Sequence, residues 1–144
     1  MSIKIKLQGF ENLINEISEA GGNVNAACDK AIRQSAQIMD AELKSNMKAA
    51  NVPNDLISRM DEPQIESNAN RYQARVGYHK GAYDPANPSD GYKVVFLNYG
   101  TPKRTQHGKI VARGFIQKAK RSAKRKIKAE MKNAFEVIIE GLKE

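Results

Sequence analysis

The sequence predicts an α+β domain in which a small antiparallel sheet packs with two long helices, accompanied by short helices. Apolar and polar residues alternate in two short segments, and apolar residues recur at helical spacing in two long ones. The chain has 144 residues, 6% aromatic residues and no Trp. A single domain of this length buries about 70% of the surface of its unfolded chain. We therefore expect one domain, residues 1–144, with a largely aliphatic core.

The N-terminal part predicts a strand followed by a short helix. In the segment SIKIKL, Ile3, Ile5 and Leu7 alternate with polar residues, which is the period of a half-exposed strand. From Phe10 onward, apolar residues recur at i, i+3, i+4 and i+7. This spacing indicates an amphipathic helix that ends at the glycines of positions 21 and 22.

A long helix is predicted next, with Asn23 as its N-cap and Pro53 as the latest point at which it can end. The small residues of its apolar stripe indicate close packing against a second helix. The stripe comprises Val24, Ala27, Cys28, Ala31, Ile32, Ser35, Ile38, Met39, Leu43 and Met47.

Between residues 52 and 90 we predict a pair of strands, followed by an exposed and mobile loop over residues 79–91. The segment RYQARVGY alternates Tyr72, Ala74 and Val76 with polar residues, as a strand does. The residues that follow are rich in Gly, Pro, Asn and Asp, which favour turns.

A short helix and a long basic helix are predicted to complete the chain. We expect Asp90 to cap the short helix and Gly100 to end it. The buried face of the short helix is expected to comprise Tyr92, Val95, Phe96 and Tyr99. The basic helix is expected over about residues 114–142, packed along the helix that follows Asn23. Its apolar stripe comprises Ile116, Ala119, Ala123, Ile127, Met131, Ala134, Ile138 and Leu142.

Positive charge is concentrated in one part of the chain. The formal net charge is +8, and residues 103–132 contain twelve Lys or Arg and one Glu, a local balance of +11. A solvated helix gains about 0.2–0.5 kcal/mol from each acid–base pair at i, i+4, whereas like charges at that spacing repel each other. The cations of the last helix up to residue 132 are Lys118, Lys120, Arg121, Lys124, Arg125, Lys126, Lys128 and Lys132. Three interpretations stay open: contact with a polyanion, contact with an acidic protein surface, or a solvated face without a partner.

The sequence predicts no catalytic site, no cofactor and no metal site. His79 and His107 lie in polar segments without the paired His, Cys or carboxylate spacing of a zinc site. Cys28 has no identifiable His partner that would activate it as a nucleophile, and a single cysteine is compatible with a reducing compartment. A nuclease that uses His107 is the enzymatic alternative. No apolar run predicts a secretion signal or a membrane span, so we expect no membrane contact.

The motifs VVFLNYGT and ARGFIQKA resemble those of the neck and tail-component proteins of long-tailed bacteriophages, which join heads to tails or complete the tail. The first motif matches at Phe96, Leu97, Tyr99, Gly100 and Thr101, and the second at Ala112, Arg113, Phe115, Ile116 and Ala119. Gly114 and Lys118 stand where the family usually has proline, and Gln117 where it often has arginine. The segment IKIKLQGFENLINEI, which precedes the long helix, is similar to the family's opening.

The resemblance implies a structural, non-enzymatic virion protein that assembles at the neck or tail end, as a homo-oligomeric ring around the path of the DNA. Its partners would be other phage neck and tail proteins, and it would be in the host cytoplasm during assembly. The basic helix would line the DNA channel or bind an acidic neighbouring ring. The residues expected to make these contacts are Lys118, Lys120, Arg121, Lys124, Arg125 and Lys128. The alternative function is nonspecific nucleic-acid binding by the same helix, through phosphates and not through base edges.

Overall fold

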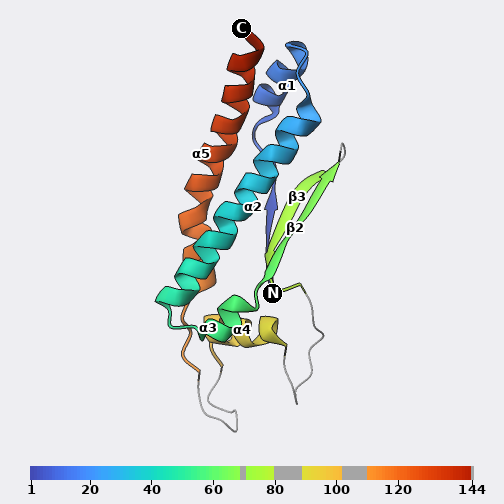
Figure 1. The fold of residues 1–144 in the computed structure, drawn as a ribbon. Helices are drawn as coiled ribbons and strands as arrows, with labels where there is room; N and C mark the ends of the chain where they lie inside the picture. The colour runs from blue at the N-terminus through green and yellow to red at the C-terminus, as the bar shows by residue number, and fades with distance from the viewer. Residues whose placement is uncertain (69–70, 80–88, 102–109, 144) are drawn as a thin grey trace.

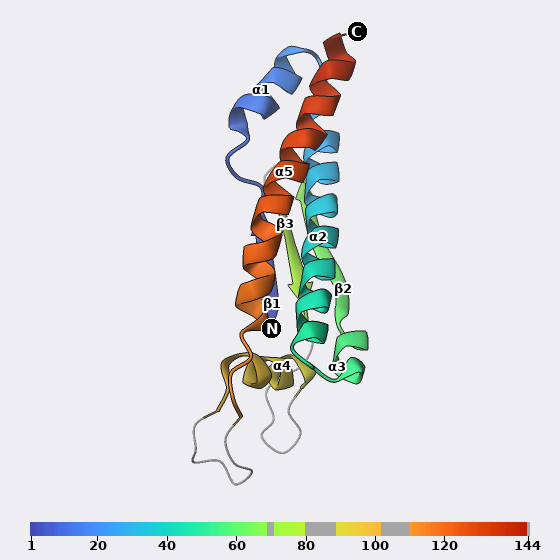
Figure 2. The ribbon, with the colours of Figure 1, turned by 90° about the vertical axis from the view of Figure 1, so that its left-hand side faces the viewer.

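The structure is a computed structural model that describes residues 1–68, 71–79, 89–101 and 110–143. Its elements are β1 (Ser2–Lys6), α1 (Glu11–Glu19), α2 (Val24–Ala49), α3 (Asn54–Ser58), β2 (Asp61–Asn68), β3 (Arg71–Gly77), α4 (Asp90–Tyr99) and α5 (Phe115–Lys143). The long helices α2 and α5 lie side by side, and the sheet packs on α2 (Figures 1 and 2). This arrangement confirms the predicted α+β fold, in which a small antiparallel sheet packs with two long helices.

The three strands form one antiparallel sheet in the order β1-β3-β2, so β3 is the central strand and β1 and β2 are its edges. Ile3 lies opposite Val76 and Ile5 opposite Ala74, and all four side chains are buried. The alternation predicted for β1 and β3 is therefore confirmed at these positions. Gln73 is an exception to the alternation predicted for β3, because this polar residue is only 5% exposed. Its side-chain amide donates to the carboxylate of Glu66 at 2.6 Å.

α2 begins as the sequence predicts. The side chain of Asn23 accepts a hydrogen bond from the N–H of Ala26 at 3.0 Å, which satisfies one of the free donors at the helix N-terminus. The buried residues of α2 are Ala27, Cys28, Ala31, Ile32, Ser35, Ala36, Met39, Leu43 and Met47. Its interface with α5 is the most extensive between any two elements. Small residues on both helices allow this close approach.

The stripe of α5 departs from the prediction in the last turns. Every fourth residue from Phe115 is buried: Phe115, Ala119, Ala123, Ile127, Met131, Phe135 and Ile139. Leu142, which was expected to be buried, is 38% exposed, and Ile138 is half-buried. Within this row, the ring of Phe135 packs against the ring of Phe10, with the ring centroids 5.7 Å apart.

α4 turns a different face to the core from the one predicted. Val94 and Asn98, one turn apart, are 0% and 1% exposed, whereas Tyr92 and Tyr99 are 38% and 57% exposed. The other predicted positions are half-buried: Val95 and Phe96. The prediction is wrong because an asparagine occupies the buried position, where it bonds to the backbone of α5. Gly100 ends the helix with φ +79°, as predicted.

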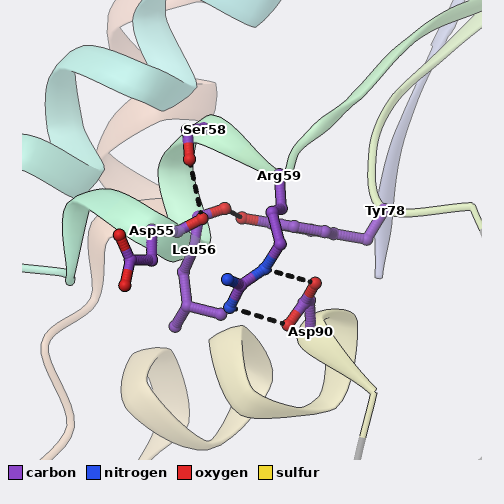
Figure 3. A network of polar contacts seen from close by, with 6 residues as sticks. All are labelled: Asp55, Leu56, Ser58, Arg59, Tyr78 and Asp90. Atoms are coloured by element: carbon purple, nitrogen blue, oxygen red, sulfur yellow. Dashed lines mark hydrogen bonds and ion pairs between the residues drawn. The ribbon is translucent and has the colours of Figure 1, made fainter.

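Polar contacts join α3, α4 and the sheet (Figure 3). Arg59 Nε lies 3.0 Å from Asp90 Oδ2, and Arg59 Nη2 lies 3.3 Å from Asp90 Oδ1. The hydroxyl of Tyr78 donates to the carbonyl of Leu56, and burial raises the pKa of Tyr78 to about 12. Asp90 was expected to be the N-cap of α4. Ser89 holds that position without a side-chain bond, and Asp90 pairs with Arg59 instead.

Most of the loop predicted over residues 79–91 lies outside the described residues, as does His107. Its two ends are described. The backbone N–H of His79 donates to the carboxylate of Asp61 at 2.7 Å, and Gly91 is buried in the first turn of α4.

Candidate assembly surface

The two sequence motifs meet at one end of the α2–α5 pair, where α4 ends and α5 begins. The backbone N–H of Thr101 donates to the carbonyl of Ile110 at 2.9 Å, and Thr101 Oγ1 accepts from the N–H of Ile110 at 2.9 Å. This reciprocal pair holds the motifs side by side. We call residues 97–101 and 110–116 the α4–α5 junction.

Gly100 allows the two chain segments of the junction to approach each other closely. Its φ of +79° and ψ of +177° are almost confined to glycine. A Cβ atom at this position would lie 2.7 Å from the carbonyl oxygen of Ile110 and 2.9 Å from the backbone nitrogen of Ala112. Any side chain here would therefore push the segments apart.

Asn98 caps α5 from a distant point in the sequence. Its side-chain oxygen accepts from the N–H of Ile116 at 2.8 Å, and its backbone carbonyl accepts from Arg113 at 3.1 Å and from Gly114 at 3.0 Å. The first N–H groups of a helix have no partner within the helix. The sequence analysis missed this role. No local sequence signal could have found it, because the amide that Asn98 meets belongs to a residue 18 positions later.

Arg113 connects the junction to α2. Its Nη1 donates to the carbonyl of Ala50 at 3.2 Å and to that of Asn51 at 3.0 Å, just after the last turn of α2. A cation at this end is favoured because the last carbonyls of a helix lack partners and carry partial negative charge. One side chain therefore fixes the end of α2 relative to the start of α5.

The other motif residues divide between the core and the surface. Phe115 is fully buried, and Leu97 is half-buried against the core. Tyr99 and Ala112 are exposed, and so is the neighbouring Val111, at 70%. The junction therefore both anchors α5 and presents apolar side chains to its surroundings.

The predicted contact residues of α5 form two rows rather than one face. Lys120, Lys124 and Lys128, the lysine row, line a groove between α5 and β1. Lys118, Arg121 and Arg125, the solvent face, recur at i, i+3 and i+7 and are exposed. A third side of the helix carries Lys126, which forms an ion pair with Glu42 of α2.

The groove beside the lysine row is open and has a volume of about 770 Å³. Its floor is apolar and includes Ile5, Phe10, Ile127 and Met131. Its opposite wall is β1, which contributes Lys4 and Lys6, and no acidic residue lines it within the described chain. The groove therefore combines apolar surface with uncompensated positive charge.

The solvent face has no acid close enough to neutralise it in the described part of the chain. None of its three cations forms an ion pair with a described residue. Because like charges three and four residues apart repel each other, this face costs helix stability. A partner surface of opposite charge would relieve that repulsion.

Cys28 and His79, which were considered as reactive or metal-binding residues, make contacts within the fold. Burial raises the pKa of the Cys28 thiol, which disfavours the reactive thiolate. His79 Nε2 lies 3.2 Å from the carbonyl oxygen of Glu62, next to β3. Within the described ranges, no three His, Cys, Asp or Glu residues are grouped so that they could hold a metal ion.

No helix in that part of the chain combines the length and apolarity that a membrane crossing requires.

The described residues thus bring together three features: the α4–α5 junction, the groove with its lysine row, and the solvent face of α5. All six predicted contact residues lie in the last two. Comparison with known proteins adds no relative, because the chain matches no family model, no curated protein and no solved structure.

Proposed function

We propose that this protein is a structural subunit of a bacteriophage or prophage virion, acting in head-to-tail joining or tail completion as part of a ring at the neck. The α4–α5 junction is the observation that carries the proposal. The two motifs that resemble phage neck and tail proteins are separated by ten residues, 102–111, yet they share hydrogen bonds. Two short matches whose residues bond to each other behave as one motif and not as two independent coincidences.

The charge on α5 supports an assembly role. The solvent face is exposed and has no neutralising acid among the described residues. A ring subunit would place such a face toward the DNA path or toward an acidic neighbouring ring. In both positions the partner would offset the repulsion that the isolated chain carries.

The proposal is tested by disabling this gene in the phage or prophage that encodes it and examining the particles by electron microscopy. We expect separate heads and tails, or tails with defective ends, and loss of infectivity. Complementation with the unchanged gene should restore complete particles. Normal infectious particles from the disabled phage would overturn the proposal.

Nonspecific nucleic-acid binding is the second candidate, and the solvent face favours it because Lys118, Arg121 and Arg125 are free to meet phosphates. Binding to random-sequence duplex DNA should weaken linearly in log Kd with log salt, with a slope of about 2 to 3 if three phosphates are neutralised. Changing the three cations together to Ala should abolish it, whereas changing the lysine row should not. Micromolar binding at physiological salt would favour this candidate, because it lies at the tight end of the range of about 10⁻⁴ to 10⁻⁶ M that nonspecific contacts give there.

A further inference from the structure

β1 is an edge strand whose outer edge faces the groove beside α5. Met1 and Tyr78 exchange two backbone hydrogen bonds, of 3.2 and 2.6 Å, and the N–H of Leu7 donates to the carbonyl of Tyr72 at 3.3 Å. In an antiparallel pair, bonded positions alternate with positions whose N–H and C=O point away from the partner strand. The backbone groups of the three even-numbered residues therefore point outward: Ser2, Lys4 and Lys6.

This edge has the requirements for accepting another strand. Three successive N–H and C=O pairs point outward on one side of β1, and neighbouring strands in a sheet need only about 4.8 Å of separation. The groove there has a volume of about 770 Å³ and an apolar floor. An extended segment placed in it would gain backbone hydrogen bonds from β1 and apolar contacts from the floor.

The positive charge of the groove and the spacing of its lysines indicate which side chains the bound segment carries. The lysine row and the two lysines of β1 give five positive charges, with no acid among the described lining residues. Lysines four apart on a helix are separated by about 6 Å along its axis, because the rise is about 1.5 Å per residue. Alternate residues of a strand are separated by about 6.6 to 6.8 Å. Acidic side chains at alternate positions therefore match the lysine row in spacing as well as in charge.

We propose that the groove between β1 and α5 binds an extended acidic segment of a partner protein, which adds to β1 as a fourth strand. Backbone hydrogen bonds to the edge of β1 hold the segment in register. On the face of the added strand that is turned toward α5, its carboxylates meet the lysine row and the methylene groups of its acidic side chains lie on the floor. Its intervening side chains point to the other face of the sheet, as Lys4 and Lys6 do. The inference does not depend on the proposed role in a virion, because it concerns a binding surface of the isolated chain.

A second copy of this chain is a poorer occupant. Pairing of two β1 edges would place the lysines of both copies against each other. The other edge strand, β2, is acidic, but Glu66 already accepts from Gln73 at 2.6 Å and Asp61 from His79 at 2.7 Å. Pro63 also removes one N–H from β2. The charge complement therefore has to come from a different protein.

The test uses a fluorescent ten-residue peptide in which Glu alternates with Val, titrated against the full chain at physiological salt. Two triple variants are compared: the lysine row changed to Ala, and the solvent face changed to Ala. Both lose three positive charges from the same helix, so the change in net charge is the same and its position differs. We expect the lysine-row variant to weaken binding at least about tenfold, and the solvent-face variant to change it less than about twofold.

A second pair of variants tests strand addition directly. Lys4→Pro removes an outward N–H without touching the bonds to β3, whereas Lys4→Ala retains it. Binding should be lost in Lys4→Pro and kept in Lys4→Ala, with circular dichroism confirming that both are folded. As a check that does not depend on folding of a variant, a peptide with proline at its centre should not bind the unchanged chain.

Four results would overturn the proposal. The first is no binding of the acidic peptide to the unchanged chain at concentrations up to about 1 mM, where association is no longer specific. The second is an equal loss of binding in both triple variants, which would mean general charge attraction. The third is duplex DNA that binds the groove while the peptide does not. The fourth is self-association, measured by sedimentation, that Lys4→Pro abolishes, which would assign the edge to a second copy.

Discussion

The side-chain oxygen of Asn98 accepts a hydrogen bond from the backbone N–H of Ile116 at 2.8 Å, so that the last turn of α4 caps the first turn of α5. Helix caps are usually local, and here the cap comes from another helix. Asn98 is 1% exposed, which means that its polar side chain is buried at the point where the two motifs meet. The start of the longest helix therefore depends on a tertiary contact.

Replacing Asn98 by Ala should destabilise the protein by about 1 to 3 kcal/mol. The loss of a capping side chain alone costs about 0.5 to 2 kcal/mol, and the change also leaves a cavity in a buried position. The free energy of unfolding in urea measures the total, and hydrogen exchange of the Ile116 amide measures the local effect. Gln117→Ala, on the exposed side of the same turn, is the control and should change stability by less than about 0.5 kcal/mol. Equal losses in both variants would contradict the capping role.

Gly100→Ala should destabilise the protein more than Gly114→Ala, although both glycines have positive φ angles, of +79° and +62°. The added Cβ at Gly100 would lie 2.7 Å from the carbonyl oxygen of Ile110, whereas at Gly114 nothing lies within 4 Å. We expect about 1 kcal/mol for Gly114→Ala from backbone strain, and about 2 to 4 kcal/mol for Gly100→Ala. Thermal or urea unfolding of the two variants distinguishes these values. A difference below about 0.5 kcal/mol would show that the junction relaxes around the new methyl group.

Arg121→Glu should increase stability by about 0.5 to 1 kcal/mol. The new carboxylate would lie three or four residues from Lys118, Lys124 and Arg125, which replaces repulsion by attraction. Arg121→Gln, which removes the repulsion without adding attraction, should give an intermediate value. Unfolding in urea at low salt measures the gain, and 1 M salt should remove most of it. If the variant is more stable yet fails to complement a phage in which the gene is disabled, the arginine serves partner contact.

Ionisation of Tyr78 should lower the stability of the protein at high pH. Its pKa is raised to about 12 in the folded protein and is about 10 in the unfolded chain, so ionisation favours unfolding. Its contribution is fully present below pH 10 and is lost as the pH rises from about 10 to 12. Tyr78→Phe should be about 1 kcal/mol less stable at pH 8, because the carbonyl of Leu56 loses its donor. This deficit should shrink or reverse by pH 12, as measured by urea unfolding of both proteins. Parallel curves across that range would contradict the prediction.

Local patterns predicted the elements other than α3, but not every buried face. The cap at Asn23 and most of the stripe of α2 follow from residues within the helix itself and agree with the structure. Val24 and Ile38 of the predicted stripe are half-buried, and Ala36 is buried although it was not predicted. The burial of Asn98 and the exposure of Tyr99 could not be predicted in this way, because an asparagine is buried only where a distant backbone group meets it. The same reason applies to Gln73, which is buried through its bond to Glu66 on the neighbouring strand.

The sequence predicted which cations of α5 are candidates for partner contact, but not how they divide between the groove and the solvent face. The sequence showed a cationic helix, and helical spacing alone could not divide its cations between two surfaces. That division depends on where β1 and α2 lie. Lys124 faces β1 across the groove, whereas Lys126, two residues later, pairs with Glu42 of α2.

The packing of α2 against α5 has a consequence for how the chain folds. The two helices make the most extensive interface in the structure, yet α3, the strands β2 and β3, and α4 separate them in the sequence. Contacts between distant segments require a large loop to close first, which slows folding relative to a bundle of sequential helices. Until α5 docks, the apolar stripe of α2 lacks its main cover. We therefore expect no stable intermediate that lacks α5, so that the molecule gains or loses its core in one cooperative step.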